Sequence, residues 1–389
     1  MDVNNKIIYI HPAIRVYRVG IFELLSKKLK IEFFWSEDMS KNNNHIFEEV
    51  NRVLENIDIN YTQANELHNI PVDSFSWGLF KLPFQNYKVY IFSNIIGVPY
   101  LLLAPFLKLF GKKVILFDEL WKYPIEVKKY KKIYPYVKFL SKYCLDGVVT
   151  AGSKAKEFYI NDLEFAEDKI AIAYNTTIDT KKYVKDEELN KIIRDKLDNI
   201  TSKKRLLYLG RIVKYKGLDI LIEAMKDINQ EYDLVVIGDG EFKAECENLV
   251  DELGLKRRVH FLGSCLSNEA PYYYKNSNIF VLPTRFRLDA NVQIESWGFT
   301  VNEAMALEVP VVTTTAVGSG FDLIVDGVTG GLANAGYIES LVEKINFVIE
   351  NNKDNVIGKK AREYLMKVCN YDDNYLAYEK VIDKVINAK

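Results

Sequence analysis

Two glutamates, Glu295 and Glu303, flank a glycine in the stretch ESWGFTVNEAMA. A buried helix avoids carboxylates unless each has a partner. Either both acids lie on a solvated face, or they point toward a polar ligand in a cleft. A predicted strand ends near Pro283 and a loop, 284–297, follows. The pattern therefore predicts Glu295 in this loop and Glu303 about one turn inside a helix that begins near Phe299.

The start of this predicted helix could bind hydroxyl groups. Gly298 lets the backbone approach a ligand closely. The free amides around Trp297, Phe299 and Thr300 can receive hydroxyls or negative charge. A carboxylate on each side of such a helix start suits vicinal hydroxyls, as on a sugar and a ribose. Two chance surface glutamates are the alternative.

A second candidate group follows the predicted strand RLLYLG, in the stretch YLGRIVKYKG. Gly210 ends the strand, and Arg211 and Lys216 come before a helix that starts near Gly217. Arg offers a forked set of donors and Lys a point charge, which together suit a diphosphate. A surface arginine and lysine at a turn would have the same local sequence.

The stretch IGDGEFK, 237–243, also follows a predicted strand and precedes a helix. A dinucleotide-binding fingerprint requires glycine at 243, where the chain has Lys243, and the loop after the first strand has no matching glycines. The sequence therefore disfavours a nicotinamide or flavin enzyme.

Short apolar runs alternate with helical patterns and predict two parallel sheets, each covered on both faces. Amphipathic stretches such as 97–110 and 124–143 separate the runs. The strands of the first half are predicted at 6–11, 31–35, 89–93, 114–118, 147–152 and 169–175. Those of the second half are predicted at 205–210, 232–240, 259–263, 279–283 and 309–315.

The fold expected is α/β, with two doubly wound, Rossmann-like domains facing across a cleft. A polar, charge-rich segment near 180–204 separates them. We predict an N-terminal domain over 1–185, a C-terminal domain over 186–370, and a closing helix, 371–389, that packs back on the first domain. Ligands of such sheets bind beyond the carboxyl ends of the strands, so the cleft is the expected site.

Several motifs occur in order between residue 205 and about residue 332: YLGRxxxxKG, VVIGDGEF, VHFLG, IFVLPT, the two glutamates and VDGVTGGL. This succession resembles the family-4 retaining glycosyltransferases of GT-B fold. The first half resembles them less closely, through YRVGIFELL (17–25) and SKAKEFYI (153–160).

The resemblance implies roles for individual residues. Arg211 and Lys216 would hold the donor diphosphate and stabilise the departing nucleotide, and Gly210 would lie beside it. Glu295, with amides of Trp297, Gly298 and Phe299, would hold the donor sugar. The ribose hydroxyls would bind Glu303. The base would meet the backbone near Gly263 and Ser264, and Thr300 completes the predicted donor site.

The acceptor side departs from the family pattern. Many members carry a histidine near the reacting sugar, and relatives often have it where this chain has Asp118 and Glu119. His11, at the end of the first strand, is the remaining histidine candidate, and Arg18 stands in the loop where paired glycines are usual. The four are candidate acceptor-side residues, and a buried, satisfied acid is the alternative for Asp118.

The loop TRFRLDANVQIE is longer than usual in the family. Arg285, Arg287 and Asp289 in this loop either shape sugar specificity or are simply exposed.

Composition limits the partners. The net charge of −1 argues against nucleic acid. The four cysteines form no CxxC pair, which favours reduced thiols in the cytoplasm. Prolines interrupt the most apolar run, so no membrane span is expected. Between Lys108 and Lys142 there are ten lysines and three acids. They form either a solvated helix face or a surface for anionic lipid or a phosphorylated acceptor.

Together with the rest of the sequence, this resemblance implies a cytoplasmic, retaining glycosyltransferase, peripheral on the inner face of the membrane. It would transfer a hexosyl group from a nucleotide-diphosphate sugar to a glycan or lipid-linked acceptor, in O-antigen or capsule biosynthesis. Neither a metal nor a cofactor is expected. Two alternatives share the fold: a nucleotide-sugar epimerase or hydrolase, and a non-catalytic sugar-nucleotide binding protein.

Overall fold

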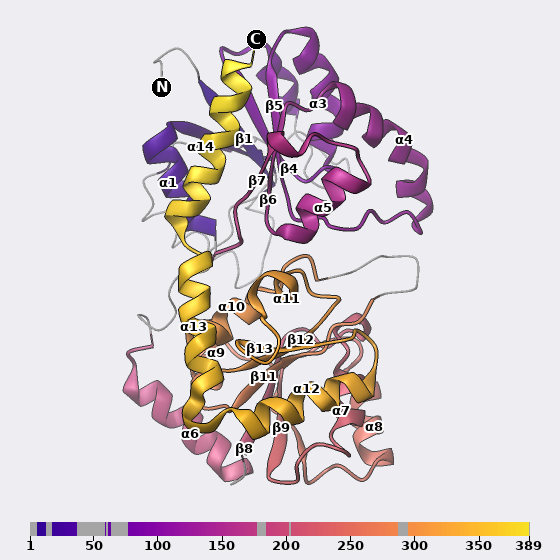
Figure 1. Ribbon diagram of the computed structural model, residues 1–389, viewed down its shortest axis with the longest axis vertical. Helices are drawn as coiled ribbons and strands as arrows, with labels where there is room; N and C mark the ends of the chain where they lie inside the picture. The colour runs from indigo at the N-terminus through magenta and orange to yellow at the C-terminus, as the bar shows by residue number, and fades with distance from the viewer. Residues whose placement is uncertain are drawn as a thin grey trace. The chain divides into compact units, whose positions relative to one another are not determined.

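The computed structural model describes residues 6–12, 18–36, 59, 61–63, 77–176, 184–201, 204–286 and 295–388. The chain forms two compact units (Figure 1). The first comprises Met1–Ile178 and Cys369–Lys389, and the second comprises Asp179–Val368. The sequence analysis expected the first boundary between residues 185 and 186.

The first unit is built on a seven-stranded parallel sheet in the order β3-β2-β1-β4-β5-β6-β7. Its strands are β1 (Ile7–His11), β2 (Ile31–Trp35), β3 (Tyr61–Gln63), β4 (Val89–Ser93), β5 (Lys113–Asp118), β6 (Gly147–Thr150) and β7 (Ile170–Ile172). Its helices are α1 (Val19–Leu29), η3 (Trp77–Phe84), α3 (Val98–Leu109), α4 (Lys128–Tyr143), α5 (Ser153–Asn161), η4 (Glu167–Lys169) and α14 (Tyr371–Asn387).

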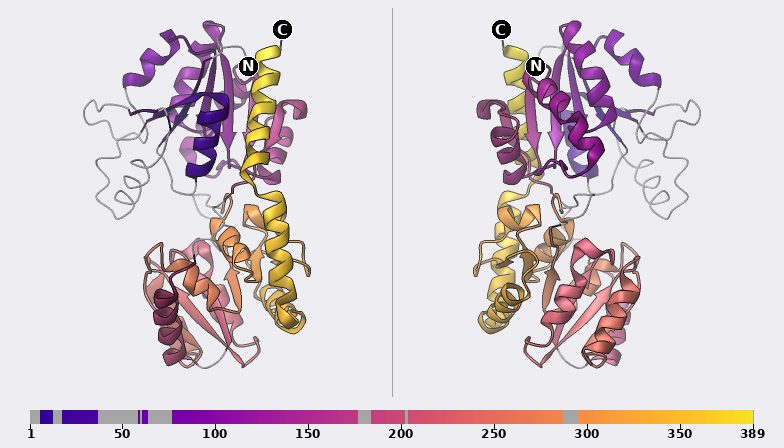
Figure 2. Two further views of the ribbon diagram at one scale, coloured as in Figure 1. Left: turned by 90° about the vertical axis from the view of Figure 1, so that its left-hand side faces the viewer. Right: turned by 90° about the vertical axis from the view of Figure 1, so that its right-hand side faces the viewer.

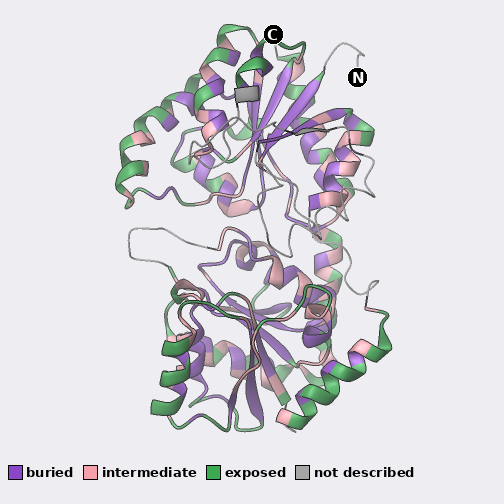
Figure 3. Ribbon diagram, turned by 180° about the vertical axis from the view of Figure 1, so that it is seen from behind, coloured by how far each residue is buried: buried purple, intermediate pink, exposed green. Residues whose placement is uncertain are grey.

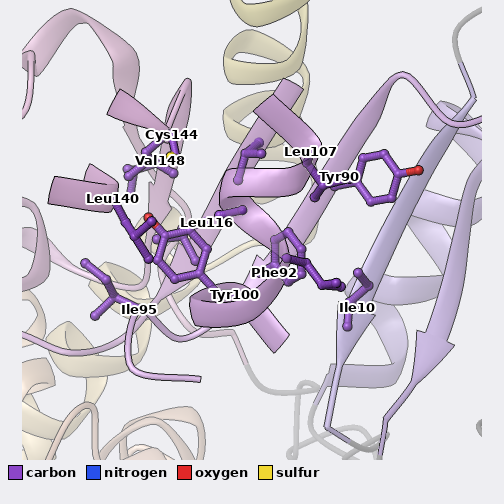
Figure 4. Packing of buried hydrophobic residues seen from close by; sticks show 14 of the residues in the cluster. Ile10, Tyr90, Phe92, Ile95, Tyr100, Leu107, Leu116, Leu140, Cys144 and Val148 are labelled. Atoms are coloured by element: carbon purple, nitrogen blue, oxygen red, sulfur yellow. The ribbon is translucent and has the colours of Figure 1, made fainter. Parts of the chain in front are cut away.

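Two apolar cores cover the two faces of this sheet, because successive strand residues point to opposite sides. Tyr9 packs with Phe22 of α1 and Tyr378 of α14 on one face. Ile8 and Ile10 face the other side, among residues of α3, α4 and α5. Figure 4 shows this second core, where side chains of the strands meet those of α3 and α4.

The closing helix α14 belongs to the first unit, where it contacts α1, β6 and β7 (Figure 2). Asn374 Nδ2 donates to the Tyr174 carbonyl at 2.8 Å, and Lys384 Nζ lies 2.6 Å from an Asp168 carboxylate oxygen. These bonds fix the helix at both ends, as its predicted packing on the first domain requires.

The second unit has a six-stranded parallel sheet in the order β10-β9-β8-β11-β12-β13. Its strands are β8 (Lys204–Leu209), β9 (Tyr232–Ile237), β10 (Val259–Phe261), β11 (Ile279–Leu282), β12 (Val311–Thr314) and β13 (Gly330–Ala333). Its helices are α6 (Glu187–Ile200), η6 (Lys214–Lys216), α7 (Leu218–Ala224), α8 (Lys243–Glu252), α9 (Ala270–Lys275), α10 (Phe299–Ala306), α11 (Gly318–Leu323), α12 (Ile338–Asn351), η7 (Lys353–Asn355) and α13 (Val356–Val368).

The prediction of two doubly wound α/β domains is confirmed. Figure 3 shows the pattern expected of sheets covered by helices, with buried strands inside and exposed turns on the outer helix faces. The sequence analysis did not predict two short strands, β3 and β13. Among the described residues, no helix is long and apolar enough to cross a bilayer.

Candidate functional site

The carboxyl ends of the strands in the second unit lie along one edge of the parallel sheet. Gly210 directly follows β8, and Gly263 and Ser264 come soon after β10. The segment after β11 leads to Glu295 and to α10. The predicted donor residues therefore all follow strands of the same sheet, at the edge where doubly wound folds bind ligands.

Contacts with β8 itself and with the loop after β9 hold the loop after β8 in place. The Tyr208 hydroxyl donates to the Arg211 carbonyl at 2.8 Å. The Ile212 amide donates to the Asp239 carbonyl, also at 2.8 Å. A Cβ on Gly238 would collide with the Gly210 carbonyl, so only glycine permits this approach of two loops. The glycines of IGDGEFK thus shape the loop that carries Arg211.

The two predicted cations differ in their surroundings. Arg211 is exposed, and its Nη2 donates to the Tyr215 hydroxyl at 3.1 Å. Lys216 is largely buried and its ammonium forms an ion pair with the Glu295 carboxylate. The two paired side chains keep 12% and 21% of their surface exposed. The structure thus joins a residue predicted for the diphosphate to one predicted for the sugar, which the sequence analysis did not foresee.

The backbone of Glu295 is fixed by the segment between β12 and α11. The Glu295 amide donates to the Ala316 carbonyl at 3.1 Å, and the Gly318 amide donates to the Glu295 carbonyl at 2.9 Å. Glu295 also forms a parallel bridge with Val317. Because the amide and the carbonyl of Glu295 are both hydrogen-bonded, the backbone that carries its carboxylate has a defined position.

Helix α10 begins where the sequence predicted, at Phe299. Gly298 precedes it with φ of 91°, a conformation that favours glycine. Phe299 and Thr300 lie in the first turn, half-buried, where helix amides have no partner within the helix. The Trp297 side chain is buried and its indole Nε1 donates to Asn302 Oδ1 at 2.8 Å, so this ring stabilises the helix start.

Glu303 lies on α10 and accepts a hydrogen bond from the buried Tyr274 hydroxyl at 3.0 Å. Burial raises the pKa of Glu303 to about 7, and the bond from Tyr274 opposes this shift. Burial raises the pKa of the Cys265 thiol to about 11, and the nearby Glu269 and Glu303 carboxylates add smaller effects in the same direction. Glu303 is therefore near the segment of Gly263 and Ser264.

That segment is held from the neighbouring strand end, because the Gly238 amide donates to the Gly263 carbonyl at 2.8 Å. Gly263 has φ of 76°, and Ser264 is exposed.

The described contacts therefore join the predicted donor residues in two groups. Arg211, Lys216 and Glu295 form one around Tyr215, and Glu303 forms the other with Tyr274. The first offers positive charge to an anion and the second an acceptor to hydroxyls. The roles of these residues remain predictions.

Sequence analysis named Arg285 as either shaping sugar specificity or exposed, and did not predict that it holds the first group. Arg285, after β11, forms an ion pair with Asp219 of α7, in which its Nη2 lies 2.6 Å from each carboxylate oxygen. Its Nε donates to the Lys214 carbonyl at 2.9 Å. Arg285 thus ties the turn of Lys216 to α7, whereas Arg287 and Asp289 lie outside the described residues. No local pattern distinguishes this clamp from an exposed arginine.

In the first unit, His11 ends β1 and is buried among aromatic rings. Its ring centroid lies 5.3 Å from that of Phe22 and 6.2 Å from that of Trp35, both edge-on. This environment matches a core histidine better than one that contacts an acceptor.

Arg18 and Glu119 form an ion pair, and Asn175 bonds to both. The Arg18 guanidinium also lies 4.4 Å from the centroid of the Phe117 ring. Glu119 keeps 30% of its side chain exposed, against 8% for Arg18. The pair brings two predicted acceptor-side residues together, and Glu119 is the more accessible.

Asp118 has the environment of a satisfied buried acid. Its carboxylate accepts bonds from the Ile95 and Leu120 amides, each at 3.0 Å, and from the Tyr159 hydroxyl at 2.7 Å. Burial raises the pKa of Asp118 to about 6, against the opposing effect of these bonds. The surroundings of Asp118 therefore agree with the alternative considered for it, a buried acid whose hydrogen bonds are satisfied.

A cavity of about 490 Å³ lies in the first unit at the carboxyl ends of β1 and β4. Pro12, Ser93 and Asn94 line it from the strand ends, and Val98 and Lys129 line it from α3 and α4. Its position makes it a candidate acceptor pocket. None of the four predicted acceptor-side residues is among its lining residues.

The architecture is that of GT-B proteins, as predicted. Anabaena HepE in complex with UDP-glucose superposes with a TM-score of 0.73 over 97% of this chain and 99% of that chain, at 17% sequence identity. At this identity the likeness concerns the fold.

Residues 190–364 match the family described as glycosyl transferases group 1. The match covers most of the second unit, and the predicted resemblance to glycosyltransferases is confirmed there. An uncharacterized glycosyltransferase of Methanocaldococcus jannaschii is 32% identical over 162 residues, 41% of this chain and 43% of that protein. The capsular polysaccharide biosynthesis glycosyltransferase CapM of Staphylococcus aureus is 29% identical over 232 residues, 58% of either chain. The chain spans about half the length of the curated relatives it matches.

Proposed function

We propose that this protein is a retaining glycosyltransferase that uses a nucleoside-diphosphate sugar. The observation that supports this most is the Lys216–Glu295 ion pair beside Arg211, at the ligand-binding edge of the second sheet. The family match of residues 190–364 supports the same reaction class.

In this proposal the cations act on the leaving group. The bond from the sugar C1 to the diphosphate oxygen breaks, and negative charge grows on that oxygen. Arg211 and Lys216 stabilise this charge, which preorganised donors do best where water is restricted. Lys216 meets this condition, since 12% of its side chain is exposed. No metal ion is needed to neutralise the charge.

The carboxylates act on hydroxyl groups. Glu295 accepts bonds from the donor sugar, with the amides of Trp297, Gly298 and Phe299, once the diphosphate competes for Lys216. Glu303 accepts bonds from the ribose, and the Tyr274 hydroxyl holds its carboxylate in position. Backbone near Gly263 and Ser264 meets the base, and Gly210 and Thr300 lie beside the diphosphate.

The acceptor hydroxyl attacks C1 on the face from which the diphosphate leaves, so the anomeric configuration is kept. Its proton passes to the departing diphosphate. Glu119 is the first candidate to orient the acceptor, because it combines partial exposure with fixation by Arg18 and Asn175. His11 and Asp118 are weaker candidates, because both are buried.

We propose a glycan or lipid-linked acceptor in the synthesis of a cell-surface polysaccharide. The likeness to CapM, whose name assigns it to capsular polysaccharide biosynthesis, supports this choice. A lipid-linked acceptor requires the protein to work at the inner face of the membrane, which agrees with the excess of lysines between Lys108 and Lys142.

Product analysis tests the proposal. Purified protein is incubated with a panel of nucleotide-sugars, with and without lipid-linked glycan acceptors, in the presence of a chelator. We expect transfer that requires the acceptor, survives the chelator, and gives the donor's anomeric configuration by NMR.

Other products would contradict the proposal in distinct ways. Free sugar or an epimerised nucleotide-sugar formed without acceptor would indicate a hydrolase or epimerase. Donor binding by calorimetry without consumption with any acceptor would indicate a binding protein.

A further inference from the structure

Helix α3 of the first unit carries a stripe of exposed apolar side chains. Leu102, Phe106 and Leu109 follow one another at spacings of four and three residues, so they lie on one face of the helix. They are 40%, 52% and 83% exposed. The opposite face of α3 is buried against the sheet through Leu103 and Leu107. The exposed stripe therefore takes no part in the packing of the core.

Helix α4 carries a second stripe, formed by Tyr136, Phe139 and Tyr143, which are 41%, 50% and 59% exposed. The ring centroids of Tyr136 and Phe139 are 6.4 Å apart, and those of Phe139 and Tyr143 are 5.0 Å apart. The Tyr136 hydroxyl donates to the Leu101 carbonyl at 2.8 Å, which joins α4 to α3.

The surface extends past the end of α3. Phe110 follows the helix directly, and its ring centroid is 5.4 Å from that of Phe84, which is 77% exposed. We call the two stripes, with the Phe84–Phe110 pair, the α3–α4 apolar face. Exposed apolar side chains gathered on adjoining elements of a protein surface indicate an interaction site.

The charge beside this face is positive. Lys128, Lys131, Lys132 and Lys142 of α4 are exposed. The Lys142 ammonium lies 5.5 Å from the centroid of the Tyr143 ring, so a cation directly adjoins the apolar stripe. A second copy of the chain would bring like charges together, whereas an anionic surface would complement them.

We propose that the α3–α4 apolar face docks on an anionic lipid bilayer. Aromatic and aliphatic side chains would enter the boundary between headgroups and acyl chains, and the lysines would contact anionic headgroups. The sequence analysis raised membrane contact from the lysines alone, and the structure adds the apolar side chains that would insert. The inference deepens the proposed function, because a bilayer would present a lipid-linked acceptor to the first unit.

Vesicle flotation without donor or acceptor tests docking separately from transfer. The probes are phosphatidylcholine vesicles with and without phosphatidylglycerol, at low and high salt. The test variant combines Phe106→Ser, Leu109→Ser and Phe139→Ser, all at exposed positions. The matched control is Leu376→Ser on α14, which is 52% exposed on the helix that covers the other sheet face. Thermal melting checks that both variants fold.

We expect the wild type and the Leu376→Ser control to float with anionic vesicles at low salt. The affinity of the triple variant for these vesicles should be lower by a factor of at least about ten. Absence of wild-type binding at low salt would overturn the inference, as would equal binding of the triple variant. If the wild type does not bind vesicles but self-associates, and the triple variant does not self-associate, the inference is overturned and the face binds a second copy of the chain. Acceptor-dependent transfer could still be observed in each of these cases.

Discussion

The carboxyl-end edges of the two sheets carry similar side chains in different environments. In the second unit, Arg211 is exposed, and Lys216 and Glu295 pair with each other while keeping part of their surface accessible. In the first unit, Asp118 is buried with three hydrogen-bond donors around it, and His11 is packed among aromatic rings. A polar residue near a strand end is therefore a better ligand candidate when part of its side chain stays accessible than when the fold buries and surrounds it.

The largest effect expected from this comparison concerns Lys216. Lys216→Ala removes the charge that we propose stabilises the leaving group, and should lower turnover roughly a hundred- to a thousandfold. Steady-state transfer kinetics measure it. The control is Lys214→Ala, an exposed lysine in the same turn, which should stay near wild type. An equal loss in both variants would mean that the turn as a whole, rather than the ion pair, matters.

The reverse behaviour is expected of Asp118. Asp118→Ala leaves two amides and the buried Tyr159 hydroxyl without their acceptor, which should lower the free energy of unfolding by about 3 kcal/mol. Urea denaturation measures this loss, with the exposed Asp162→Ala as control. Nucleotide binding by the folded variant should be unchanged, because Asp118 is in the first unit. Full stability would show that the acid is not structural.

Arg285 should have an intermediate effect on kinetics. Arg285→Ala frees the Lys214 carbonyl and Asp219 and loosens the turn that carries Lys216, so kcat/KM should fall roughly tenfold. Arg285→Lys should recover little, because one ammonium replaces two separate guanidinium nitrogens, Nη2 on Asp219 and Nε on the Lys214 carbonyl. A lysine variant with wild-type kinetics would refute the clamp.

The smallest expected effect is a pH dependence set by Glu303. In the role that we propose, its carboxylate must be ionised to accept the ribose hydroxyls best, and burial raises its pKa to about 7. Therefore kcat/KM should fall as pH drops below about 7. Tyr274→Phe removes a donor that stabilises the carboxylate, so the fall should begin at higher pH. The pH profile of Glu303→Gln should lack this limb, and an unchanged limb would assign it to another group.

Local sequence patterns predicted much of the fold and the order of the site residues. Buried apolar runs located most strands, and Gly298 with the apolar residues after it located the start of α10 at Phe299. Strand β13 was missed because Gly330 and Gly331 replace the expected apolar run.

Contacts between distant residues were not predictable from one sequence. Lys216 and Glu295 are 79 positions apart, and nothing near either residue indicates its partner. The environment of His11 was equally unpredictable, because the rings of Phe22 and Trp35 that surround it belong to other elements. Tyr274 lies in a run of three tyrosines that is typical of a core, so the sequence does not indicate its hydrogen bond to Glu303.

The central claim is that the edge carrying Arg211 and Lys216 binds a nucleoside diphosphate. Calorimetric titration of the wild type and of the Arg211→Ala, Lys216→Ala double variant with UDP, GDP, ADP and dTDP tests it most directly. The account predicts that at least one nucleotide binds the wild type, and that the double variant binds it at least about a hundredfold more weakly. Equal affinity in the two proteins, or no binding to the wild type, would contradict it.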